Sequence, residues 1–91
     1  MQQVHILISG KVQGVYYRAS CLEVAQKLGL TGWVKNLSTG QVEVLAQGEK
    51  EKLEKLIEWC REGPDGAIVN DIKVNWDSQI KEKFKNFIVS Y

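Results

Sequence analysis

Arg18 is the side chain in this sequence that is best placed to bind an anion. It ends the stretch 10-GKVQGVYYR-18, which contains two glycines, and a helical pattern begins directly after it. The chain has ten lysines but only two arginines, Arg18 and Arg61. A lysine cannot replace an arginine where a planar guanidinium must bind two oxygens at once. The type and place of Arg18 therefore indicate a candidate site for an anion such as phosphate.

The glycine loop before Arg18 supplies a second means of binding the same anion. A loop between a strand and a helix can direct several backbone N–H groups into one concavity, and the helix dipole adds to their field. The guanidinium then contributes two parallel hydrogen bonds. A tight turn with an exposed arginine would carry the same residues, so this stretch alone does not decide between the two. It is not a Walker loop, because no Gly-Lys-Ser/Thr follows.

The hydrophobic pattern predicts the elements that position this loop. Residues 3–9 alternate as a strand, residues 10–17 form the loop, and 37-LSTG-40 predicts the turn of a hairpin within 31–48. Further strands are predicted over 67–76 and 84–91. Apolar residues at i, i+3, i+4 and i+7 predict helices over 18–28 and 49–62. Their stripes are Cys21, Val24, Ala25 and Leu28 in the first, and Leu53, Leu56, Ile57 and Cys60 in the second.

The order of these elements predicts the fold. It is β-α-β-β-α-β with an additional C-terminal strand, within one domain over residues 1–91. We expect the α+β class, as a two-layer ferredoxin-like sandwich with an antiparallel sheet and two helices on one face. The helices would run antiparallel, which brings Cys21 and Cys60 towards the same end. We expect both cysteines to be buried and reduced, with a disulfide as the alternative.

Composition excludes several classes of partner. The net charge is +1, whereas nucleic-acid modules carry a clustered basic excess, so we expect no nucleic-acid partner. No apolar stretch approaches the roughly 18 residues of a membrane span, and no segment has the pattern of a signal peptide. We therefore expect a cytoplasmic protein with no membrane partner. The aromatic residues permit RNA stacking as a further alternative, but the strands at 3–9 and 41–47 carry none.

The remaining candidates for chemistry are few. His5 is the only histidine and, with two cysteines, it cannot complete the usual four-ligand zinc site. It lies on the strand face opposite Val4 and Ile6, where a structural role is expected. No arginine follows Cys21 closely, which argues against covalent cysteine catalysis. Asn36 by itself is a polar residue at the end of a hairpin strand, where local hydrogen bonding is expected.

Two spaced motifs resemble those of the acylphosphatase family. The family pairs a Gly-x-Val-Gln-Gly-Val-x-aromatic-Arg loop with a Gly-Trp-Val-x-Asn strand and a Gly-x-Val-Glu-Val continuation. This chain has 10-GKVQGVYYR-18 and 32-GWVKNLSTGQVEVLAQG-48. The segments 63-GPDGA-67 and 87-FIVSY-91 are also similar, so the resemblance spans essentially the whole chain. Two departures concern the loop: Tyr16 replaces a smaller residue, and Tyr17 stands where phenylalanine is commoner.

The resemblance implies an activity and assigns the site residues. It implies hydrolysis of acyl phosphates, which are carboxyl-phosphate mixed anhydrides, to a carboxylate and inorganic phosphate. Asn36 would position the attacking water. The resemblance implies a small-molecule acyl phosphate substrate, and we expect a monomer without metal or cofactor. The alternative is a non-catalytic anion- or small-molecule-binding domain of ferredoxin-like fold. The phosphoryl group would be held by the Arg18 side chain and the backbone amides of Gln13, Gly14, Val15, Tyr16, Tyr17 and Arg18.

Overall fold

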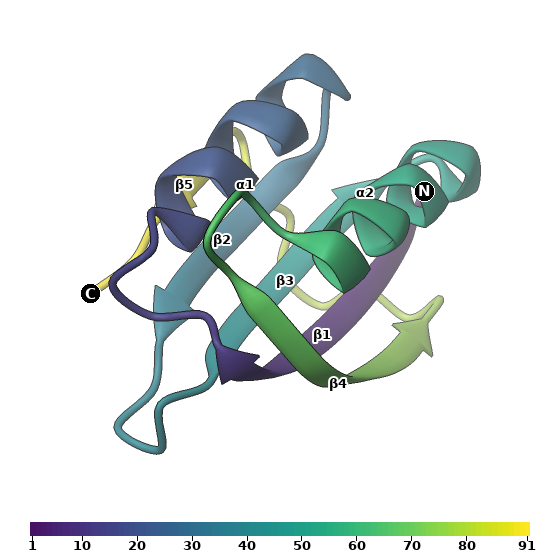
Figure 1. Cartoon of the computed structure of the whole chain (residues 1–91). Coiled ribbons are helices and arrows are strands. Elements are labelled where there is room, and N and C mark those ends of the chain that lie inside the picture. Colours follow the sequence, from purple (N-terminus) through teal and green to yellow (C-terminus); the bar gives the residue numbers. More distant parts are fainter.

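The computed structural model describes residues 1–91 and packs two helices on one face of a five-stranded sheet (Figure 1). This arrangement confirms the predicted ferredoxin-like α+β sandwich. The predicted bounds differ by one or two residues, except that the last strand, predicted over 84–91, is confined to Phe87–Val89. The elements are β1 (Gln2–Lys11), α1 (Tyr17–Lys27), β2 (Thr31–Asn36), β3 (Val42–Gly48), α2 (Lys50–Glu62), β4 (Ile68–Asp77) and β5 (Phe87–Val89).

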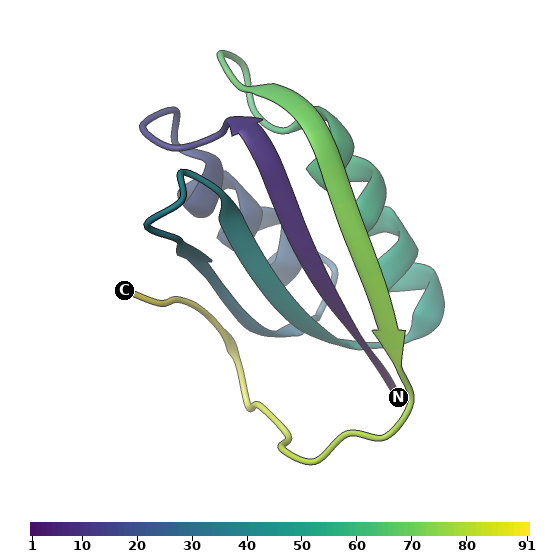
Figure 2. The same ribbon diagram turned by 90° about the horizontal axis from the view of Figure 1, so that it is seen from below.

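The sheet has the strand order β4-β1-β3-β2-β5. Its first four strands pair antiparallel, as expected, but β5 pairs parallel with β2. The expectation of an antiparallel sheet therefore fails at the last strand. Residues 78–86 carry the chain from β4 to the opposite edge of the sheet (Figure 2). Because β4 and β2 run in opposite directions, a chain that returns along the far edge must run parallel to β2.

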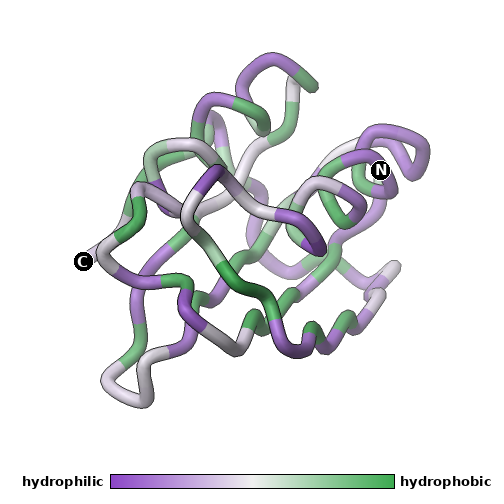
Figure 3. Tube along the Cα trace, viewed as in Figure 1, coloured by the Kyte–Doolittle hydropathy of each residue, from purple (hydrophilic) through white to green (hydrophobic).

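Alternation along the strands places one face of the sheet in the core. Hydrophobic and hydrophilic residues alternate along the chain trace of the strands (Figure 3). On β1, Val4, Ile6 and Ile8 are fully buried, as the period of two predicts. The neighbouring strands bury residues on the same face, so the core lies between the sheet and the two helices. These neighbouring core residues are Val34 on β2 and Val42, Val44 and Ala46 on β3.

The two helices differ in how well their predicted stripes match the core. All four predicted residues of α2, from Leu53 to Cys60, are buried. In α1, Cys21 and Ala25 are buried, whereas Val24 and Leu28 are only partly buried. The third buried residue of α1 is Tyr17, which is the first residue of the helix. Neither helix is long and apolar enough to cross a membrane.

Cys21 and Cys60 lie where the start of α1 meets the end of α2. Both are free thiols with no exposed surface, which confirms that they are buried side by side in the core. A hydrogen bond with Cys60 raises the pKa of the Cys21 thiol well above its ordinary value, and burial raises it further. A thiol that is buried and protonated is a poor nucleophile. The two cysteines are therefore structural residues.

Candidate active site

Arg18 and Asn36 lie on the wall of one pocket with a volume of about 380 Å³. Three parts of the chain form this pocket: the end of β1 with its loop and the start of α1, the end of β2, and the segment from β5 onward. Tyr91 at the C-terminal end of the chain lines this pocket together with Gly14 and Tyr16 of the loop that precedes α1. The lining residues are Val12, Gly14, Tyr16, Tyr17, Arg18, Ala19, Asn36, Val89 and Tyr91.

The loop begins at a bulge between β1 and β4. The pairing register shifts between Ser9 and Gly10, and a Cβ atom at Gly10 would lie 2.1 Å from the carbonyl oxygen of Ile68. Only glycine permits so close an approach of the two backbones. The first glycine of the motif therefore fixes how the chain leaves β1 and enters the loop.

Two left-handed residues shape the rest of the loop. Gly14 has φ 76°, and Tyr16 has φ 64° and ψ 24° at the N-cap of α1. Tyr16 is the only non-glycine residue of the chain with a positive φ. A left-handed conformation costs a side chain about 1–2 kcal/mol, and a bulky residue seldom adopts it. These turns end the strand and start the helix within a few residues.

The backbone N–H groups of residues 13–19 donate no hydrogen bond within the protein. The first N–H group after them that does so is that of Ser20, which donates to the Tyr16 carbonyl at 3.0 Å. No side chain caps α1. Several of these residues line the pocket, so a row of unpaired donors lies at its wall. Such a row is the arrangement that binds anions at helix N-termini.

The charges around this pocket are also arranged for an anion. The first turn of α1 contains no acidic residue, and Arg18 makes no ion pair. No carboxylate side chain lines the pocket. The positive end of the helix and the guanidinium therefore act together, without an acidic side chain to neutralise them.

Arg18 contacts Tyr91, a residue that sequence reasoning did not identify as part of the site. Its Cζ atom lies 5.1 Å from the centroid of the Tyr91 ring, a cation–π contact. The backbone N–H of Ser90 donates to the Val34 carbonyl at 2.8 Å and holds this segment beside β2. In the sequence, the segment 87-FIVSY-91 shows only its similarity to the acylphosphatase family. No sequence pattern indicates that its tyrosine contacts Arg18.

Asn36 is the last residue of β2, opposite Val42 of β3. Its Oδ1 atom is buried and has no hydrogen-bond partner in the protein. A buried acceptor without a partner is uncommon in proteins and needs an explanation. Because Asn36 also lines the pocket, a donor bound there could supply the missing hydrogen bond.

The other predicted residues of the loop divide into two groups. Gly14, Tyr16, Tyr17 and Arg18 line the pocket, whereas Gln13 and Val15 do not. The Gln13 side chain donates to the carbonyl of Leu37 at 2.8 Å and to that of Gln41 at 2.9 Å. It thereby fastens the loop to the hairpin that carries Asn36. Val15 is partly buried against the core.

Tyr17 fixes the start of α1 to the core and to the end of α2. Its side chain is 1% exposed, and its hydroxyl donates to the carbonyl of Cys60 at 2.7 Å. The ring packs against Trp59 with centroids 5.1 Å apart and planes 56° apart. Burial raises the pKa of the Tyr17 phenol far above its ordinary value, and the neighbouring Cys60 raises it further. Tyr17 holds the helix end that carries Arg18.

The alternative candidates lie away from this pocket. His5 Nε2 lies 2.7 Å from Glu43 Oε2 on the sheet face opposite the core, which confirms a structural position. Strand pairing puts Trp33 and Trp76 on opposite faces of the sheet, and Trp59 is on α2. The tryptophans therefore share no stacking surface. No three histidine, cysteine, aspartate or glutamate residues gather as metal ligands.

Comparison with known proteins agrees with this geometry. The acylphosphatase family model matches residues 4–89. An acylphosphatase of Methylococcus capsulatus is 46% identical over 98% of this chain and 96% of its own length. One of Marinobacter nauticus is 59% identical over 75% of this chain and 74% of its own length. The crystal structure of acylphosphatase from Bacillus subtilis superposes with a TM-score of 0.96 at 35% identity, with both chains fully covered.

These matches support hydrolysis of acyl phosphates and give no support to a non-catalytic binding domain. The relatives carry the activity in their names and are matched over most of their length. The fold, the pocket at the start of α1 and the comparisons agree. The chain belongs to the acylphosphatase family.

Proposed function

We propose that this acylphosphatase holds the phosphoryl group of its substrate in the pocket at the start of α1, with Arg18 and Asn36 as catalytic residues. The observation that carries the proposal is the row of unpaired N–H groups at residues 13–19 beside an arginine without an ion pair. The N–H groups of residues 13–18 and the guanidinium bind the phosphoryl oxygens. Such charge-assisted hydrogen bonds are roughly twice as strong as neutral ones.

Binding of this kind is sufficient for much of the chemistry. Phosphoryl transfer passes through a loose transition state in which charge spreads over the phosphoryl oxygens. Donors fixed before the reaction stabilise that charge without reorganising. The leaving carboxylate departs without needing a proton. The reaction therefore requires positioning and charge stabilisation, and we propose that it proceeds without a metal ion or cofactor.

Asn36 positions the attacking water in this proposal. Its unpaired Oδ1 accepts a hydrogen bond from the water, which leaves a lone pair of the water oxygen directed at phosphorus. As the P–O bond to water forms, the P–O bond to the carboxylate breaks. The water proton passes to a phosphoryl oxygen, and the products are a carboxylate and dihydrogen phosphate. Asn36 thus acts on the nucleophile and Arg18 on the phosphoryl group.

The same proposal covers the partners of the protein. The substrate is a small acyl phosphate that fits the pocket of about 380 Å³, and the chain acts as a cytoplasmic monomer without a nucleic-acid or membrane partner. A net charge of +1 agrees with recognition by local groups rather than by bulk electrostatics. Size-exclusion chromatography with light scattering tests the monomer, and a dimer would contradict it.

Two measurements test the proposed site. Release of phosphate from acetyl phosphate should persist in a chelator, and loss of activity that returns with added magnesium would contradict metal independence. Titration with inorganic phosphate should shift the backbone amide NMR signals of residues 13–19 most strongly. The N–H groups at the start of α2, residues 50–52, are the internal control. We call the N–H groups of residues 13–18 and the Arg18 guanidinium the phosphate cradle. Shifts centred on α2, with residues 13–19 unaffected, would overturn this cradle.

A further inference from the structure

The pocket at the start of α1 is larger than a phosphoryl group needs. A phosphate has five non-hydrogen atoms, and at the roughly 30 Å³ that one water molecule takes in the liquid it fills about 150 Å³. The pocket has about 380 Å³. More than half of its volume therefore remains for the acyl part of a substrate. The residues around that remainder decide which acyl groups fit.

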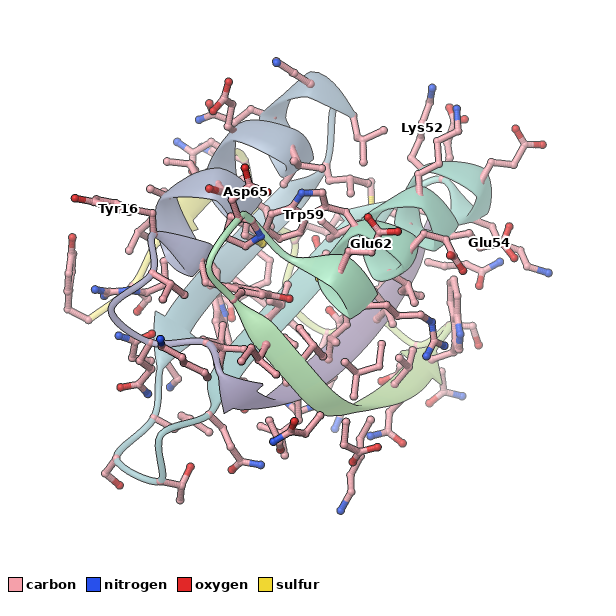
Figure 4. All side chains as sticks on the ribbon, in the orientation of Figure 1. Tyr16, Lys52, Glu54, Trp59, Glu62 and Asp65 are labelled. Carbon is pink, nitrogen blue, oxygen red and sulfur yellow. The ribbon has the colours of Figure 1, made fainter.

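Tyr16 is the first of two aromatic residues around this space. It is 83% exposed and makes no hydrogen bond through its side chain, so the ring contributes little to the fold. It nevertheless occupies a left-handed position, which a glycine would adopt without strain. Strained residues that the fold does not require are found mainly at functional sites. The ring extends away from the body of the molecule beside the pocket (Figure 4).

Tyr91 is the second aromatic residue on this wall. It is 99% exposed and lines the same pocket, and the centroid of its ring lies 5.1 Å from Arg18 Cζ. Large exposed aromatic side chains that gather at one pocket are typical of ligand sites. Tyr16 lies two residues before Arg18 in the chain, the Tyr91 ring contacts Arg18, and all three residues line one pocket.

The charges of the pocket define the acyl group further. Arg18 is the only charged side chain among its lining residues. In the proposed function the phosphoryl group binds that guanidinium. A carboxylate or an ammonium group in the acyl part of the substrate would therefore have no oppositely charged side chain to pair with. Apart from Asn36 and Gly14, the other lining residues are apolar or aromatic, and Val12, Ala19 and Val89 lie beside the tyrosines.

We propose that Tyr16 and Tyr91 form an acyl subsite that selects substrates with a flat, apolar acyl group, such as an aromatic acyl phosphate. This inference rests on the proposed function, because it places the phosphoryl group at Arg18. Stacking on tyrosine changes affinity by about two- to ten-fold for each ring. The subsite therefore tunes the choice of substrate, whereas the phosphate cradle supports turnover.

The test compares two substrates in three variants. The ratio of kcat/KM for benzoyl phosphate over acetyl phosphate should fall about two- to ten-fold in Tyr16→Gly. Glycine keeps the left-handed loop, and hydrolysis of acetyl phosphate reports the cradle separately. Tyr16→Phe should keep the wild-type ratio because stacking does not need the hydroxyl. Trp76→Ala, which removes an exposed aromatic residue on β4 outside the pocket, is the matched control and should also keep the ratio.

Calorimetry separates this inference from the proposed function. Benzylphosphonate should bind the wild type more tightly than methylphosphonate, and Tyr16→Gly should reduce that difference by the same factor. An unchanged ratio in Tyr16→Gly, by kinetics and by calorimetry, would overturn the acyl subsite and leave the cradle intact. Failure of the wild type to hydrolyse either substrate would overturn the proposed function, while the phosphonate comparison would still decide whether the subsite exists.

Discussion

The two helices of this protein begin in different ways, and the difference supports the site proposed at the start of α1. Neither has a side-chain cap at its N-terminus. The first turn of α2 contains Glu51, whose carboxylate offsets the positive end of that helix. The first turn of α1 contains no acid and places Arg18 there instead. The positive end of α1 therefore remains unbalanced by the protein, and it opens onto the pocket.

Stability and function thus impose opposite requirements on the same structural feature. At α2 the Glu51 carboxylate in the first turn offsets the positive end of the helix dipole, which favours folding. At α1 the N–H groups of residues 13–19 have no partner in the protein, and Tyr16 adds a strained conformation. Tyr17 offsets part of this cost by burying its ring against Trp59 and bonding to the Cys60 carbonyl. The predictions below test each side of this comparison.

The largest effect is expected for Asn36→Ala, which leaves the phosphate cradle intact. Turnover should fall about a hundred- to a thousand-fold, because one well-placed polar contact in the transition state contributes about 2.7–4 kcal/mol. The inhibition constant of inorganic phosphate should stay nearly unchanged, since Asn36 acts on the water. Asn75→Ala, on exposed β4, is the matched control. Full turnover in Asn36→Ala, or a parallel loss of phosphate binding, would contradict this role.

Arg18→Lys keeps the charge at the start of α1 but removes the planar pair of donors. Loss of one charge-assisted hydrogen bond costs about 1.5–3 kcal/mol, so kcat/KM should fall about ten- to a hundred-fold. Steady-state kinetics with acetyl phosphate measure this fall in kcat/KM. Arg61→Lys makes the same change at the end of α2, where the arginine is exposed and pairs with Glu58 at 4.0 Å. Equal activities of the two variants would make Arg18 an ordinary surface residue.

Ala19→Glu would give α1 the acidic first turn that α2 already has. Ala19 is exposed and lines the pocket, so its new carboxylate would repel a bound phosphate. Two like charges about 4 Å apart repel each other by about 1 kcal/mol in bulk water and about 4 kcal/mol near a protein surface. The phosphate inhibition constant should therefore rise at least five-fold, while the melting temperature stays the same or rises. Unchanged phosphate affinity would show that the anion does not bind at this helix end.

Alkaline pH should weaken the buried support beneath α1. The ordinary pKa values are 10.0 for tyrosine and 9.0 for cysteine, and the folded protein raises those of Tyr17 and Cys21. As the pH rises past 9, the unfolded chain loses protons that the folded chain keeps. The free energy of unfolding should then fall by about 1.4 kcal/mol per pH unit for each group.

Urea unfolding at several pH values measures this slope. Below pH 8 these two groups should contribute no pH dependence, because both are protonated in the folded and the unfolded chain. Tyr17→Phe should give a shallower slope above pH 10, whereas Tyr16→Phe, at an exposed tyrosine, should keep the slope of the wild type. Equal slopes in the two variants would exclude Tyr17 as a source of the effect.

The contrast between the helices also explains what the sequence could predict. The stripe of α2 is regular because that helix has only to cover the core, and all its predicted residues are buried. The predicted stripe of α1 lies in or against the core but was incomplete, because Tyr17 is buried more deeply than Val24 and Leu28. A helix that must also present a site departs from simple periodicity.

Local motifs and long-range contacts differ in the same way. The roles predicted for Arg18 and Asn36 came from a motif, and the structure brings both to one pocket. The contact of Arg18 with Tyr91 and the parallel pairing of β5 depend on how residues 78–86 cross to the far edge. No hydrophobic pattern within a segment encodes such a crossing. The left-handed Tyr16 was likewise unpredictable, because tyrosine rarely adopts that conformation.

The smallest effect is expected for Glu51→Ala, which would give α2 the acid-free start that α1 has. Glu51 makes no ion pair, so its contribution comes from the helix dipole. Its loss should lower the free energy of unfolding by about 0.3–1 kcal/mol at low ionic strength, and less in high salt. Turnover and phosphate inhibition should not change, because α2 takes no part in the pocket. Glu54→Ala, one turn further along the exposed face of α2 (Figure 4), is the control for losing a surface charge and should cost less. Equal costs at both positions would show that the first turn of α2 needs no acid, and the contrast with α1 would then rest on Arg18 alone.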